Sequence, residues 1–159
     1  TISLGLAIGR SMAPIRRTRV VRGLYVVAGA CTIVAGVFNS DELVDGEVIE
    51  VTAPGVIHDV ASLILFATSI VAAFLLRKVF RATPGWERRA MLAPIAGTLW
   101  IAGFVAHGVL TDWFGLAQRA FVAVHIGWLG LQALWLLTTH SAADRSSGRA
   151  GSSTIANRE

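Results

Sequence analysis

The stretch Val60–Leu76, VASLILFATSIVAAFLL, contains no charged residue and is followed at once by Arg77 and Lys78. An α-helix rises about 1.5 Å per residue, so about 20 mostly apolar residues are needed to cross the roughly 30 Å hydrocarbon core of a bilayer. Extended back to Val56, the stretch reaches that length. It therefore predicts a helix that spans a membrane.

Three further runs have a similar length and composition, at residues 20–38, 90–110 and 116–138. The first includes Arg22, whose long side chain can extend back to the membrane interface. Strands of a membrane barrel are about ten residues long and alternate polar with apolar positions, whereas these runs do not alternate. The sequence thus predicts an all-α polytopic transmembrane helix bundle, with four complete spans in this chain.

The overall composition agrees with a membrane protein. Hydrophobic residues make up 54% of the 159 residues and charged residues 15%, against about 45–50% and about 25% in soluble domains. The net charge of +4 alone could suggest a nucleic-acid partner, but so few charges cannot cover a water-soluble surface, and no such partner is expected. The single cysteine, Cys31, excludes an internal disulfide and a multi-cysteine metal site.

Charges are segregated between the loops. Five arginines fall between residues 10 and 22 and five basic residues between 77 and 89, whereas residues 41–50 hold five acidic residues and no basic one. Short loops rich in Lys and Arg face the cytoplasm. We therefore expect a multi-pass cell-membrane protein with its basic loops and C-terminal tail in the cytoplasm. Anionic lipids are the expected partners of the basic loops, and a homo-oligomer or a membrane protein partner remains open.

The two ends of the chain differ from the transmembrane region, residues 16–140. Thr1–Gly9 is apolar but too short to span, so residues 1–15 are interpreted as the stub of a preceding helix followed by a cytoplasmic loop. The alternative is a short interfacial helix. Ser, Gly and charged residues dominate residues 141–159, which predicts a disordered cytoplasmic tail.

With this topology, polar residues from all four spans collect toward the extracytoplasmic side, whereas the cytoplasmic halves hold little beyond Thr68 and Ser69. The candidate cluster consists of Asp41, His58, Asp59, His107, Asp112, Gln118, Arg119 and His125. Polar residues in membrane spans tend to face the bundle interior or a water-filled cavity. We therefore expect any functional site to lie in this cluster.

The cluster allows three interpretations. In the first, Arg119 pairs with a nearby aspartate, the histidines hydrogen-bond between helices, and the protein binds lipid or a partner without a cofactor. In the second, His58, His107 and His125 hold a divalent metal such as zinc, which would activate water for hydrolysis of a lipid. In the third, the polar residues belong to a proton or small-solute pathway, which the apolar cytoplasmic halves argue against.

Three short motifs point to a family. They are Phe38-Asn-Ser-Asp41, Gly55-Val-Ile-His58 and Gly115-Leu-Ala-Gln-Arg119. In this order they resemble the bacterial membrane proteins grouped as "domain of unknown function 998", over Arg16 to Thr139. The resemblance implies a bacterial inner-membrane protein of six to seven helices, in which Asp41, His58, Gln118 and Arg119 act together. It implies no particular activity, and this chain has Asn39-Ser40 where a proline is expected.

Overall fold

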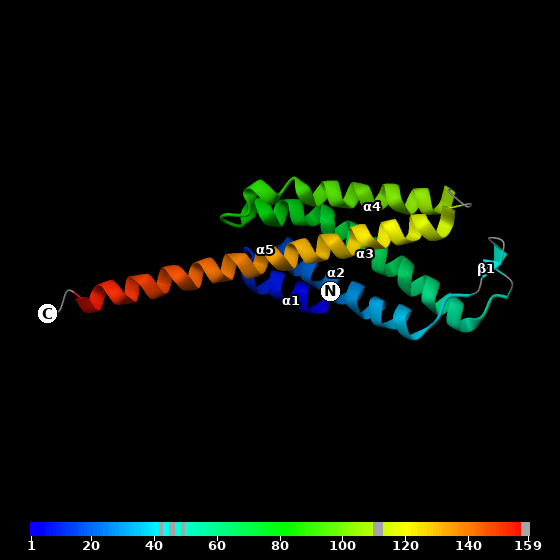
Figure 1. Ribbon diagram of the computed structural model, residues 1–159, viewed down its shortest axis with the longest axis horizontal. Helices are drawn as coiled ribbons and strands as arrows, with labels where there is room; N and C mark the ends of the chain where they lie inside the picture. The colour runs from blue at the N-terminus through cyan, green and yellow to red at the C-terminus, as the bar shows by residue number, and fades with distance from the viewer. Residues whose placement is uncertain (42, 45–46, 49, 110–112, 157–159) are drawn as a thin grey trace.

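The chain folds into a bundle of helices. The computed structural model describes residues 1–41, 43–44, 47–48, 50–109 and 113–156, and Figure 1 shows the bundle with its long axis horizontal. The elements, in chain order, are α1 (Ile2–Ser11), α2 (Arg16–Val37), β1 (Leu43–Val44), β2 (Glu47–Val48), α3 (Ala53–Ala82), the 3-10 turn η1 (Glu87–Arg89), α4 (Leu92–Val109) and α5 (Phe114–Ala156).

The prediction of four membrane-spanning helices is confirmed. In the described part of the chain, four helices are long and apolar enough to cross a membrane, and they correspond to α2, α3, α4 and α5. The predicted runs 20–38, 56–76, 90–110 and 116–138 fall on these four helices in order. Large apolar side chains such as Ile33, Leu63 and Ile126 point outward and are exposed, as expected for a surface solvated by lipid chains.

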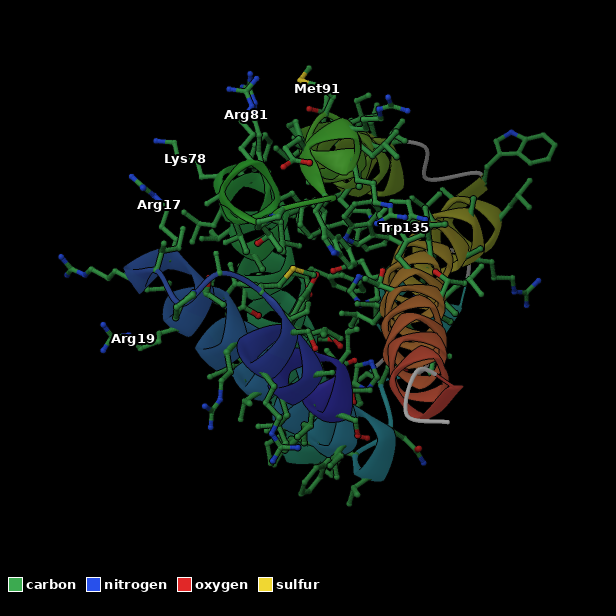
Figure 2. The ribbon with its side chains drawn as sticks, turned by 90° about the vertical axis from the view of Figure 1, so that its left-hand side faces the viewer. Arg17, Arg19, Lys78, Arg81, Met91 and Trp135 are labelled. Atoms are coloured by element: carbon green, nitrogen blue, oxygen red, sulfur yellow. The ribbon has the colours of Figure 1, made fainter. Side chains whose placement is uncertain are left out.

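The helices form a closed ring. Each of α1 to α4 packs against the next helix along the chain, and α5 returns to contact α1. Figure 2 looks along this ring, with α3 and α4 above, α5 to one side and α1 and α2 opposite it. The side chains that fill the interior include Tyr25, Leu76, Phe80 and Trp100, which are all almost fully buried. The ring therefore surrounds a packed, aromatic-rich core.

The two ends of the bundle differ in charge, and we name them accordingly. The acidic end holds the α2–α3 connection, residues 38–52, in which β1 and β2 pair as a short antiparallel ladder, Leu43 opposite Val48. The basic end holds the α1–α2 and α3–α4 connections, and it lies at the left of Figure 1. Seen from that end in Figure 2, Arg17, Lys78 and Arg81 project outward from α2 and α3.

Helix α1 lies against α2, in the opposite direction. A side-chain carbon added at Gly5 would come within 2.8 Å of the Tyr25 Cβ, and one added at Gly9 within 2.7 Å of the Arg22 Cδ. The absence of side chains at these two positions allows the two helices to approach closely. The apolar segment Thr1–Gly9 is thus part of a helix that packs into the bundle, with Ile8 buried in the core.

The predicted disordered tail is helical in the structure. Helix α5 continues without a break to Ala156, and Figure 1 shows this part extending well beyond the other helices. Composition predicts disorder because residues 141–159 have too little apolar surface to fold alone. Extending an existing helix, however, avoids the cost of starting a new one, and α5 is already helical through the membrane-spanning part.

Candidate functional site

Asp41 caps the start of helix α3. Its carboxylate accepts hydrogen bonds from the Thr52 backbone N–H, at 3.2 and 3.3 Å, and from the Thr52 hydroxyl. The Thr52 hydroxyl oxygen accepts in turn from the Gly55 N–H at 3.1 Å, which makes Thr52 the N-cap of α3. A Cβ on Gly55 would overlap the Asp41 carboxylate. Glycine at this position is therefore what allows Asp41 to reach the positive end of the helix dipole.

His58 caps the C-terminal end of helix α2. Its Nδ1 lies 2.8 Å from the carbonyl oxygen of Ala35 and 2.9 Å from that of Phe38. Both partners are acceptors, so Nδ1 carries the proton and donates to them. The last carbonyl groups of a helix have no partner within the helix. The imidazole of α3 thus satisfies carbonyls at the end of α2.

The two motifs at this junction therefore form one reciprocal arrangement. We call Asp41, Thr52, Gly55 and His58 the acidic-end clamp. A carboxylate that follows α2 holds the first turn of α3, and an imidazole from the second turn of α3 holds the last turn of α2. The clamp explains why Phe38-Asn-Ser-Asp41 and Gly55-Val-Ile-His58 occur together, and it brings Asp41 and His58 to the same junction.

The structure places the other predicted cluster residues in different surroundings. The side chains of Asp59, Gln118 and Arg119 are exposed. Asp112 and the side chain of His107 lie outside the described residues. His125 is buried in the bundle, 6% exposed, with its ring 4.8 Å from that of Trp100 and 5.6 Å from that of Phe66.

The described residues contain no assembled set of metal ligands. Among them, no group of three or more His, Cys, Asp and Glu side chains could hold a metal ion. His58 also uses Nδ1 for the clamp, which leaves only Nε2 as a potential ligand. His58 and His125 lie on α3 and α5 with separate sets of neighbours.

A buried polar pair lies nearer the basic end, where the sequence predicts almost no polar residue. The Tyr25 hydroxyl donates to Gln132 Oε1 at 3.0 Å, and Gln132 Nε2 lies 2.9 Å from the same hydroxyl. Tyr25 is fully buried and Gln132 is 1% exposed. The expectation of apolar cytoplasmic halves is therefore wrong, since α2 and α5 are joined there by a hydrogen-bonded pair.

The sequence does contain a signal for Gln132. Gln118 and His125 are seven residues apart, and Gln132 continues the same spacing. Seven residues are close to two helical turns, so residues at this spacing share a face. Tyr25 has a weaker signal, since it is the only tyrosine and lies in an uncharged run.

At the basic end, an arginine is stacked on two tryptophans. The guanidinium carbon of Arg89 lies 4.7 Å from the centroid of the Trp86 ring and 5.2 Å from that of Trp135. The two indoles pack edge-on at 6.2 Å, and both contact the Phe80 ring. Arg89 is half-buried, and the described residues give it no ion-pair partner. We call Arg89, Trp86 and Trp135 the basic-end stack.

Four helices apolar enough to cross a membrane, with large apolar side chains exposed on the outside of the bundle, define a polytopic helical membrane protein. The chain belongs to the family described as "Protein of unknown function (DUF998)", whose model matches residues 1–135. The match confirms the resemblance carried by the three motifs and extends it through α1. No curated protein and no solved structure matches the chain.

Proposed function

We propose that this protein binds anionic lipid headgroups at its basic end. The observation that carries the proposal is the basic-end stack, in which the Arg89 guanidinium is held by two indole rings without a carboxylate partner among the described residues. Arginine presents a planar fork of donors that matches a phosphate group, and stacking on aromatic rings fixes that fork in place. Tryptophans near span ends commonly lie at headgroup depth. A lipid phosphate is therefore the counter-ion that suits Arg89.

A hollow of about 340 Å³ at the same end supports the proposal. Its walls combine apolar and cationic groups: Ile15, Arg16, Arg17, Val20 and Leu75. Apolar walls suit the beginning of an acyl chain, and exposed guanidinium groups suit a phosphate. Each Lys or Arg near an anionic membrane surface contributes about 1 kcal/mol of attraction. The projecting Arg17, Lys78 and Arg81 in Figure 2 extend this positive surface over α2 and α3.

The conservative variant R89K tests the proposal. We expect it to weaken phosphatidylglycerol binding to the purified protein in detergent about tenfold, which corresponds to about 1.4 kcal/mol. Lysine keeps the charge but loses the planar fork and much of the stacking. Native mass spectrometry with phosphatidylglycerol and with phosphatidylcholine of the same acyl chains gives the comparison.

Arg88 is the matched control, because it is the adjacent arginine on η1 and its side chain is exposed. R88K should change phosphatidylglycerol binding less than twofold, since an exposed, unstacked cation contributes little that is specific. Equal effects of R88K and R89K, or equal binding of the two lipids by the unaltered protein, would contradict the proposal.

The charge distribution also supports a proposed orientation, with the basic end in the cytoplasm of a bacterial cell. The short basic-end connections carry the excess of Lys and Arg, and the acidic-end connection is rich in Asp and Glu. A fluorescent protein fused after Glu159 should then fluoresce, and alkaline phosphatase fused at the same place should stay inactive. The reverse result would place the basic end outside.

A further inference from the structure

The buried polar side chains of the bundle follow three helix faces. The side chains concerned, which we call the polar column, are Thr18 and Tyr25 on α2, Ser69 on α3 with Thr83 at its C-cap, and His125 and Gln132 on α5. Within each helix the two positions are seven or fourteen residues apart, so they share a face. Among the described residues, every buried side chain with a polar group belongs to this column, apart from the tryptophans. The three faces meet in the interior of the ring.

The column has a direction. Beyond His125 toward the acidic end the Phe66 and Phe121 rings pack together, 4.3 Å apart, and the exposed Phe104 ring lies 6.3 Å from Phe121 on the outside of the bundle. Toward the basic end the column continues through the Tyr25–Gln132 pair to Thr83, whose hydroxyl accepts from the Ala13 N–H at 3.0 Å. The polar interior therefore reaches the basic end and stops at an aromatic layer above His125.

Three polar atoms near the closed end of the column lack partners. Ser69 Oγ, Trp100 Nε1 and His125 Nδ1 are all fully buried and form no hydrogen bond with the described residues. The Trp100 and His125 rings are in contact, and Ser69 is one helical turn from Phe66, which packs on His125. An unsatisfied polar group is costly in a medium without water. These atoms therefore offer hydrogen bonds to a small polar molecule.

The chemistry of the three groups restricts the occupant. An indole N–H needs an acceptor, whereas a hydroxyl and a neutral imidazole can both donate and accept. The polar column contains no Asp, Glu, Lys or Arg side chain, so nothing in it compensates a charge. The suitable occupant is small, uncharged and able both to donate and to accept hydrogen bonds. Water is the smallest such molecule, and buried water commonly satisfies polar groups of this kind.

We propose that water enters the bundle from the basic end along the polar column and binds at Ser69, Trp100 and His125. The proposal is independent of lipid binding at Arg89, because it concerns the interior and not the surface. It makes the middle of the bundle a site for small uncharged polar molecules that is accessible from one side only. The aromatic layer formed by the Phe66 and Phe121 rings closes the other side.

A cysteine placed at Ser69 tests for water in the column. The background is C31A, because Cys31 is the only cysteine in the chain. The probe is methyl methanethiosulfonate, which is small, neutral and able to cross membranes. The cysteine thiolate attacks its sulfenyl sulfur, a disulfide bond forms, and methanesulfinate leaves. The reacting species is the thiolate, which apolar surroundings suppress, so the rate measures hydration of the position.

The matched control is A72C, at a fully buried position one helical turn from Ser69 that lacks a polar side chain. We expect S69C to react on the order of ten times faster than A72C, and H125C to react faster in the same way. The substitutions T18V and T83V, which remove hydroxyls at the basic end, should slow the reaction of S69C, whereas F104L should not. Circular dichroism and gel filtration establish that each variant is folded.

Two results would overturn the proposal. If both S69C and H125C react no faster than A72C, the interior is dry at both positions. If S69C reacts fast but T18V and T83V leave its rate unchanged, water does not enter from the basic end. Two reporter positions, on α3 and α5, keep the test decisive when one variant fails to fold.

Discussion

Replacing Gly55 with alanine should lower the free energy of unfolding by about 2–4 kcal/mol, which is the largest effect that we expect from a single methyl group. A Cβ at this position overlaps the Asp41 carboxylate. The carboxylate must then move away from Thr52, so the variant loses the hydrogen bonds of the α3 cap in addition to suffering a steric clash. Thermal unfolding of the purified protein in detergent measures the change.

A double-mutant cycle with Asp41 separates this explanation from a general effect of alanine. In a D41A background the clash and the Asp41–Thr52 hydrogen bonds are both absent, so G55A should cost much less there than in the unaltered protein. G36A is the matched control, because a Cβ at Gly36 meets nothing within 4 Å. Alanine is also the better helix former there. Additive effects of D41A and G55A would exclude the contact as the cause.

Replacing either partner of the Tyr25–Gln132 pair should cost about 1–3 kcal/mol, because the other partner is left buried without its hydrogen bond. Y25F removes only the hydroxyl, and Gln132 Nε2 then keeps only the Trp128 carbonyl, at 3.4 Å. Q132L leaves the Tyr25 hydroxyl buried in apolar surroundings. The free energy of unfolding of each variant, measured in mixed detergents, provides the test.

The double variant Y25F/Q132L should cost less than the sum of the two single changes, because it removes both polar groups together. T32V serves as the control, since the Thr32 hydroxyl donates within its own helix to the Ala28 carbonyl at 2.9 Å. Its loss should change stability by no more than about 0.5 kcal/mol. If Y25F and Q132L behave like T32V, the pair does not tie α2 to α5.

The sequence was sufficient to predict the helices because each one contains a long apolar run with almost no charge. The uncharged run 60–76 and the three similar runs each fall on one observed helix. The helices extend beyond the predicted spans: α2 begins at Arg16 and α3 ends at Ala82, since arginine and lysine are good helix formers that can leave the hydrocarbon without ending the helix. The start of α3 did carry a local signal, because Thr52 precedes a proline in the first turn.

The site was harder to predict because depth in the membrane does not specify which way a side chain points. Asp41 and His58 were grouped with Gln118 and Arg119 by depth, yet the first two meet at the α2–α3 junction and the last two are exposed. Tyr25 and Gln132 were missed because that grouping favoured one half of the membrane. Only the packed structure shows that Gln132, on the same face of α5 as His125, forms a hydrogen bond with Tyr25 on α2.

Helix α3 is 30 residues long, about 45 Å at 1.5 Å per residue, whereas a bilayer offers about 30 Å of hydrocarbon. Tilting, or ends that project from the hydrocarbon, must accommodate the additional length. Polar groups occupy both ends of α3, with Thr52 in the clamp and Arg81 on the basic surface. The apolar run 56–76 alone matches the hydrocarbon thickness, so the extra turns at the two ends of α3 carry the clamp and the basic surface beyond it, into the two headgroup layers.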